Sequence, residues 1–202
     1  MSKILLSVLL ILAQGLALAD ENTQRQDEQW AWKAAVVSSI ALTLALNPLK
    51  ADSAGLGIGT TNDGGAAKLI FRWMPEQNAA QWGPIAVKPY MHVAYGRWQS
   101  SKDSTQTGAN NVLEVVPIFR LGWSENAWLS YVETSVGVSV LSQSHFNDLQ
   151  FGSNFQFTDS MSVGGYGGDW DWSLQYQHYS NNSIKLPNDG INFYVFNLTH
   201  KY

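Results

Sequence analysis

From about Ser53 to the C-terminus, apolar and polar side chains alternate in segments of roughly ten residues, separated by turn-rich stretches. In an extended strand, side chains two residues apart share a face, so each segment has one apolar and one polar face. Eight such segments can be distinguished, at 53–62, 66–75, 85–98, 111–123, 128–141, 153–167, 170–180 and 191–202. The pattern predicts an all-β fold of eight antiparallel strands.

The polar face of these segments carries charge, while the other face is apolar throughout. The charged positions are Lys68, Arg72, Lys88, Glu114, Arg120 and Glu133. Charges in a dry core are costly unless they are paired. Inside a narrow barrel they can pair with each other and with water while the apolar face meets lipid. We therefore expect residues 53–202 to form an eight-stranded antiparallel transmembrane β-barrel. A soluble periplasmic barrel that holds an apolar ligand is the alternative, and such a protein would not sediment with membranes.

The connections between the segments alternate in length. Residues 99–110 and 142–154 are long and polar, whereas 124–127 and 168–169 are short. Outer-membrane barrels have long loops outside and short turns in the periplasm. Two connections depart from this rule, since 62–65 is short and 76–83 is longer than a turn needs. The last strand ends in an aromatic stripe that finishes on Tyr202, which resembles the signal read by the barrel assembly machinery, an expected partner.

The N-terminus predicts export. Lys3 precedes an apolar stretch from Ile4 to Leu18, and Ala17 and Ala19 provide small residues for cleavage, so residues 1–19 are interpreted as a signal peptide. Residues 20–52 form an extension with an apolar run at 34–46, too short for the ~20 residues of a membrane-spanning helix. This run is either a short surface helix or the working signal itself, with Lys33 as its basic end.

Composition excludes several classes of function. The net charge of −4 lacks the basic footprint of nucleic-acid binding. The chain has no cysteine, which rules out disulfides, thiolate chemistry and cysteine-ligated metals. We expect no metal and no other cofactor.

Two polar residues interrupt an apolar stripe near the C-terminus. His178 and Ser180 continue the face formed by Trp172, Leu174 and Tyr176. A Ser nucleophile needs a base within hydrogen-bond reach, and that base needs a third group to orient it. Asn192 has outward parity on the adjacent last strand, so parity predicts a cluster of His178, Ser180 and Asn192 on the outer wall.

An esterase also needs donors for the developing oxyanion. Asn181 and Asn188, with the backbone N–H groups around Asn182 and Ser183, lie in the loop between the last two strands and are the candidates. The chain has no Gly-x-Ser-x-Gly turn, so an α/β-hydrolase has no support.

The run from His178 to Ile191, with His-x-Ser-Asn followed by Pro-Asn-x-Gly-Ile, resembles the signature of the lipid A 3-O-deacylase family (PagL type). The resemblance implies an eight-stranded barrel in the outer membrane of a Gram-negative bacterium, surrounded by its lipids. It also implies metal-free hydrolysis of the ester-linked 3-hydroxyacyl chain at position 3 of lipid A, the lipid anchor of lipopolysaccharide. By this match Ser180 is the nucleophile, His178 is the base, and Lys185 is a candidate contact for a lipid A phosphate.

One departure matters, because Asn192 stands where the best-known form of the motif has Glu. An Asn carbonyl can orient an imidazole but cannot stabilise an imidazolium by charge, so we expect a slower enzyme or one that relies more on its oxyanion hole. Asp189 is a reserve carboxylate with the wrong parity. A structural or adhesive barrel without chemistry is the rival hypothesis, and the sequence leaves open whether the barrel forms a homodimer.

Overall fold

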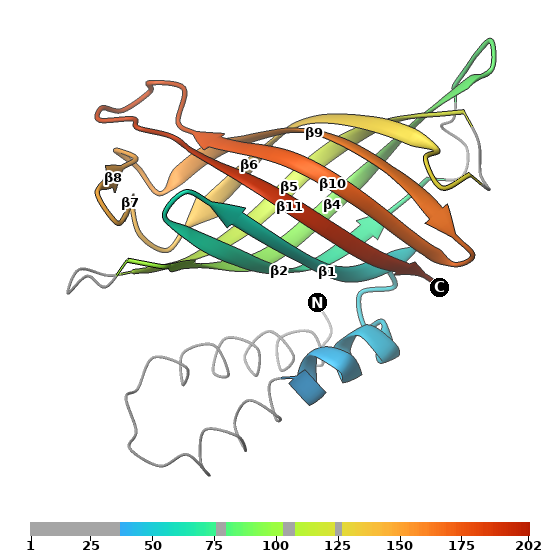
Figure 1. Cartoon of the computed structure of the whole chain (residues 1–202), viewed down its shortest axis with the longest axis horizontal. Helices are drawn as coiled ribbons and strands as arrows, with labels where there is room; N and C mark the ends of the chain where they lie inside the picture. Colours follow the sequence, from blue (N-terminus) through green and yellow to red (C-terminus); the bar gives the residue numbers. More distant parts are fainter. Residues whose placement is uncertain (1–36, 76–79, 103–107, 124–126) are drawn as a thin grey trace. The chain divides into compact units, whose positions relative to one another are not determined.

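The computed structural model describes residues 37–75, 80–102, 108–123 and 127–202, and its main feature is a closed barrel (Figure 1). Its eight long strands are β1 (Ser53–Thr61), β2 (Gly64–Trp73), β4 (Ile85–Ser100), β5 (Ala109–Gly122), β6 (Tyr131–Leu141), β9 (Phe155–Gly167), β10 (Trp170–Ser180) and β11 (Ile191–Lys201). Neighbours along the chain pair in antiparallel fashion, and β1 closes the barrel by pairing with β11. The predicted all-β, eight-stranded antiparallel barrel is confirmed, with strand ends within three residues of those expected.

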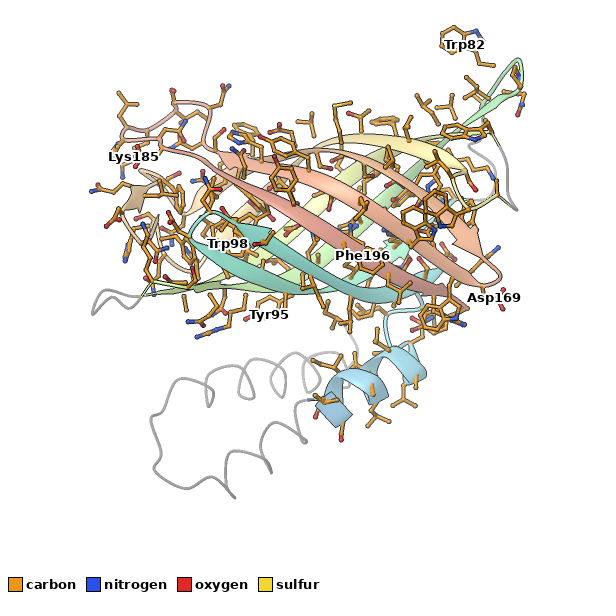
Figure 2. The ribbon with its side chains drawn as sticks, viewed as in Figure 1. Trp82, Tyr95, Trp98, Asp169, Lys185 and Phe196 are labelled. Carbon is orange, nitrogen blue, oxygen red and sulfur yellow. The ribbon has the colours of Figure 1, made fainter. Side chains whose placement is uncertain are left out.

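Two connections contain short strands that the sequence did not predict. β3 (Ala80–Trp82) extends the hairpin with β4, and Figure 2 places Trp82 at the far end of that hairpin. β7 (His145–Phe146) and β8 (Leu149–Gln150) form a separate two-stranded hairpin within the predicted 142–154 loop. Phe146 of this hairpin and Phe151, directly after it, are both fully buried.

The N-terminal segment is a unit of its own, separate from Asp52–Tyr202. Residues 37–46, within the apolar run, are helical, and both interpretations of that run stay predictions. The predicted signal peptide 1–19 lies outside the described residues, as do parts of the connections at 76–83, 99–110 and 124–127. Within the described ranges, no helix has the length and apolar character needed to cross a bilayer.

The interior of the barrel is filled by paired polar side chains. The Asp171 carboxylate lies 3.1 Å from Nη1 of Arg72 and 2.6 Å from Nη1 of Arg120. Arg120 also contacts Glu133 at 2.6 Å, and Lys68 lies 3.4 Å from Glu114. All of these residues are buried, and Lys88 is half-buried on the same face. The predicted charged face therefore points inward, as a barrel in lipid requires.

The opposite, outward face is mostly apolar. Its exposed side chains include Leu113, Phe119, Val136, Val140, Leu174 and Phe196. Such a band suits contact with acyl chains. Figure 2 places Lys185 and Asp169 at opposite ends of the barrel, with Phe196 on the wall between them.

An aromatic cluster closes the end of the barrel at which the β10–β11 loop lies. Trp98 is its centre, with ring centroids 4.9 Å from Tyr179 and 5.0 Å from Phe193. Phe146 and Phe151 pack edge-on against the same indole. Because Tyr179 and Phe193 alternate along their strands with the outward residues of the predicted site, this cluster forms a packed floor beneath that site.

Candidate active site on the outer wall

The site is built on the hairpin of β10 and β11. Along β10 the buried residues Gln177 and Tyr179 alternate with His178 and Ser180, which are half-buried on the outer face. Asn192 of β11 lies directly opposite His178 in the strand register. Its Oδ1 lies 2.6 Å from Nδ1 of His178. The parity argument therefore correctly brought His178 and Asn192 together on the outer wall.

This contact determines the tautomer of the imidazole. A carbonyl oxygen only accepts, so Nδ1 is the donor in the hydrogen bond to Asn192. In the neutral imidazole with its proton on Nδ1, the other ring nitrogen, Nε2, has the lone pair that a general base needs. Gly190, with φ of +65°, packs behind the ring: a Cβ at this position would lie 3.0 Å from Cε1 of His178. A side chain there would press on the imidazole.

Ser180 is the last residue of β10 and shares the outer face with His178. Although both residues are described, no hydrogen bond joins their side chains. Catalytic hydrogen bonds are often long in a free enzyme and shorten when substrate binds. The arrangement therefore places His178 and Ser180 on the same outer face, two residues apart along β10.

The loop from 181 to 190 is held in place by Asn181. Its side chain is fully buried, and its amide nitrogen donates to the carbonyls of Phe151 and Lys185, each at 2.6 Å. The backbone N–H of Asn181 donates to Oδ1 of Asn188 at 2.9 Å. These donors are therefore engaged by acceptors in the loop and at Phe151, and Asn181 supports the loop from below.

Other predicted donors remain in the loop. Asn182 and Ser183 both have positive φ, 52° and 60°, at the centre of a turn closed by Ile184 N–H on Asn181 O at 3.1 Å. Both residues are exposed. Asn188 is half-buried and uses its Oδ1 on Asn181, which leaves its amide nitrogen as a side-chain donor.

Asp189, the reserve carboxylate, is engaged in the loop framework. Its Oδ2 accepts from the backbone N–H of Gln150 at 2.7 Å, and its own N–H donates to Gln150 O at 3.0 Å. Gly152 permits this close packing, because a Cβ there would lie 2.4 Å from Lys185 O and 2.5 Å from Pro187 O. The β7–β8 segment thus fixes the position of the loop that follows Ser180.

The neighbouring loops are joined to the same framework. Nζ of Lys102 lies 3.2 Å from carboxylate oxygens of both Asp63 and Asp148. Hydrogen bonds to these two carboxylates raise the pKa of Lys102. The turn after β1, the loop after β4 and the β7–β8 hairpin are therefore connected at this end of the barrel.

Two grooves flank the site. One, of about 650 Å³, runs along the wall next to it and is lined by apolar side chains that include Tyr176, Leu174, Met161 and Tyr194. The other, of about 670 Å³, lies between the β7–β8 hairpin and the last loop and is polar. Lys185 lines the polar groove and is exposed.

Sequence reasoning missed one residue of this wall, Asp159 of β9. It lies directly opposite His178 in the register, on the side away from Asn192. Its neighbours along the outer face, Phe157 and Met161, are apolar. The sequence carries a signal for it, since a carboxylate on an apolar stripe is as unexpected as His178 and Ser180 on theirs.

The described residues contain no group of three or more His, Asp or Glu side chains arranged to hold a metal ion. The outer-wall arrangement consists of a hydroxyl, an imidazole with one free nitrogen, an amide that orients the imidazole and an adjacent apolar groove. Fold and site together define a small β-barrel of the outer-membrane type with a candidate Ser-His hydrolase centre on its wall.

Comparison with known proteins identifies the family. The family described as "Lipid A 3-O-deacylase (PagL)" matches residues 64–201, and the chain belongs to it. A lipid A deacylase PagL of Bordetella bronchiseptica is 31% identical over 127 residues, 62% of this chain and 67% of the relative. A lipid A deacylase PagL of Pseudomonas aeruginosa is 24% identical over 162 residues, 79% of this chain and 90% of that protein.

A crystal structure described as that of the outer membrane enzyme PagL has the same fold. The TM-score is 0.65 at 21% identity, covering 74% of this chain and 99% of the solved one. At this identity the likeness supports the architecture alone, and it agrees with the barrel described above.

Proposed function

We propose that this protein is a lipid A 3-O-deacylase, a serine esterase that removes the ester-linked 3-hydroxyacyl chain at position 3 of lipid A. Family membership supports the reaction class. The observation that carries the assignment of residues is the 2.6 Å contact between Nδ1 of His178 and Oδ1 of Asn192, on the same outer face as Ser180. If this site is inert, the rival hypothesis of a structural or adhesive barrel without chemistry takes its place.

In the proposed reaction, Nε2 of His178 takes the proton from Ser180 as Oγ attacks the ester carbonyl. Collapse of the tetrahedral intermediate breaks the bond to the sugar oxygen, which receives the proton from the imidazolium. Water, activated by the same imidazole, then releases the hydroxy fatty acid from Ser180. Asn188 and the backbone N–H groups near Ser183 are the proposed donors to the oxyanion.

The position of the site suits a substrate that stays in the membrane. The apolar groove next to it fits an acyl chain. Lys185, exposed beyond the end of β10, is the proposed contact for a lipid A phosphate. We place the protein in the outer membrane of a Gram-negative bacterium, spanning it several times, with Tyr202 ending the signal for the barrel assembly machinery.

The decisive experiment is mass spectrometry of lipid A from a Gram-negative host that expresses the wild type, Ser180→Ala or His178→Ala. Folding is checked by the change in gel mobility on heating. Loss of one hydroxyacyl mass with the wild type alone supports the proposal. An unchanged lipid A profile with a folded wild-type barrel, or continued deacylation by folded Ser180→Ala, contradicts it.

A further inference from the structure

The outer wall carries an acidic side chain that the proposed mechanism does not use. Asp159 of β9 lies opposite His178, and on the far side of His178 lies Asn192. Directly opposed residues on antiparallel strands have Cβ atoms about 4.5–5.5 Å apart. Asp159, His178 and Asn192 therefore form one row across three strands on the same face.

A carboxylate at this position has no structural explanation. Asp159 is half-buried, and its outward neighbours along β9 are Phe157 and Met161. Its register partner on β6 is Val136, an exposed apolar residue. Within the described part of the chain no cation pairs with it, unlike the buried Asp171, which contacts two arginines. An unpaired charge facing lipid is unfavourable, so folding alone does not account for Asp159.

We propose that Asp159 is a positioning residue for the esterase reaction, supplying the negative charge that Asn192 lacks. This inference rests on the proposed function. When Ser180 transfers its proton to Nε2, His178 becomes positively charged, and Asn192 can only donate or accept neutral hydrogen bonds. The Asp159 carboxylate, adjacent to the imidazole in the register, stabilises that imidazolium electrostatically. No bond to Asp159 forms or breaks.

The surroundings make Asp159 the carboxylate best placed for this task. Asp189, the other acidic side chain near the site, is bound to the backbone of Gln150. The titratable groups on the adjacent outward faces are, besides His178, the phenols of Tyr176 and Tyr194. The two roles therefore lie on two strands: Asn192 orients the ring from β11, and Asp159 supplies the charge from β9.

The test is a double-mutant cycle on the full-length purified barrel, with initial rates measured on lipid A in mixed micelles. The variants are Asp159→Asn, Asn192→Glu, the double variant, and Asp159→Glu as the charge-retaining control. We expect Asp159→Asn to lower kcat about tenfold or more with little change in KM, as for the loss of about 1.4 kcal/mol of transition-state stabilisation. In the Asn192→Glu background, where a second carboxylate contacts the imidazole, the same change should cost less than about threefold.

Ser180→Ala in the same assay distinguishes an error in the role of Asp159 from an error in the proposed function. An inactive Ser180→Ala with an unaffected Asp159→Asn overturns the role of Asp159 alone. Equal losses from Asp159→Asn in both backgrounds also overturn it, because a structural or substrate-binding residue would not be rescued by Asn192→Glu. An active Ser180→Ala overturns this inference together with the proposed function. If Asn192→Glu is itself inactive, the charge-retaining variant decides: Asp159→Glu must keep most of the rate that Asp159→Asn loses.

Discussion

Nδ1 of His178 and Oδ1 of Asn192 lie 2.6 Å apart across the β10–β11 pair, on the membrane-facing wall of the barrel. The register places the two residues directly opposite one another, so the contact is a consequence of strand pairing and not of loop conformation. An amide in this position orients the imidazole but carries no charge of its own. Orientation and charge, which a carboxylate would supply together, are therefore separate properties in this site.

The orienting hydrogen bond can be removed by Asn192→Leu, which keeps the approximate size of the side chain. A hydrogen bond of about 0.5–1.5 kcal/mol corresponds to a loss of up to roughly tenfold in kcat. The measurement is the initial rate of lipid A deacylation by the refolded protein. Thr134→Val, an exposed outward position on β6, is the matched control and should be neutral. An Asn192→Leu rate equal to that of wild type would show that the contact does not orient the base.

The barrel and the cluster on its wall were predictable because both follow from the two-residue period of a strand. Parity alone separated Arg120 and Glu133 inside from Val136 outside, and it placed His178 beside Asn192. No knowledge of distant contacts was needed for that. The same rule, applied to β9, would also have identified Asp159.

The loop could not be predicted in this way, because its conformation depends on contacts far away in sequence. Asn181 is a predicted donor to the oxyanion, yet its amide nitrogen donates to the carbonyl of Phe151, 30 residues earlier. Asp189 binds the backbone of Gln150, and that approach requires a glycine at 152. Alternation carries no information about which side chain a loop carbonyl will attract.

Gly152 provides a direct test of the loop framework. Gly152→Ala places a methyl group against the carbonyls of Lys185 and Pro187, at a residue with φ of +66°. Gly168→Ala is the matched control, since its φ is +65° but a Cβ there meets nothing within 4 Å. Both changes cost about 1–2 kcal/mol in backbone strain, but only Gly152→Ala should release the loop.

Limited proteolysis between 181 and 190, together with the deacylation rate, checks this expectation. Gly152→Ala should be cut faster and should deacylate more slowly than Gly168→Ala, while both barrels remain heat-modifiable on gels. Equal cleavage and equal rates in the two variants would mean that packing against Gly152 does not position the loop.

The buried ion cluster should determine the stability of the barrel. Asp171 contacts Arg72 and Arg120 and accepts from Oη of Tyr131 at 2.7 Å. Asp171→Asn leaves two buried guanidinium groups short of counter-charge, and breaking a buried pair in this way costs about 3–5 kcal/mol. Urea unfolding in lipid vesicles measures the change in the free energy of unfolding. Asp169→Asn, at the exposed turn between β9 and β10, should change it by less than about 0.5 kcal/mol. Comparable stability of the two variants would contradict the importance of the cluster.

The apolar groove next to the site should select for long acyl chains. Leu174 lines the groove and is 54% exposed. It lies on the same face of β10 as Tyr176 but two residues farther from His178, so Leu174→Trp fills part of the groove without changing His178 or Ser180. We expect this variant to deacylate lipid A several-fold more slowly, with a loss of roughly 1 kcal/mol in transition-state binding, and to hydrolyse a short-chain soluble ester at the wild-type rate. Val115→Trp adds the same ring to the outward face of β5, away from the groove, and should affect neither substrate. A parallel loss on both esters would place the effect in the catalytic residues, and no loss on either would show that the acyl chain lies elsewhere on the wall.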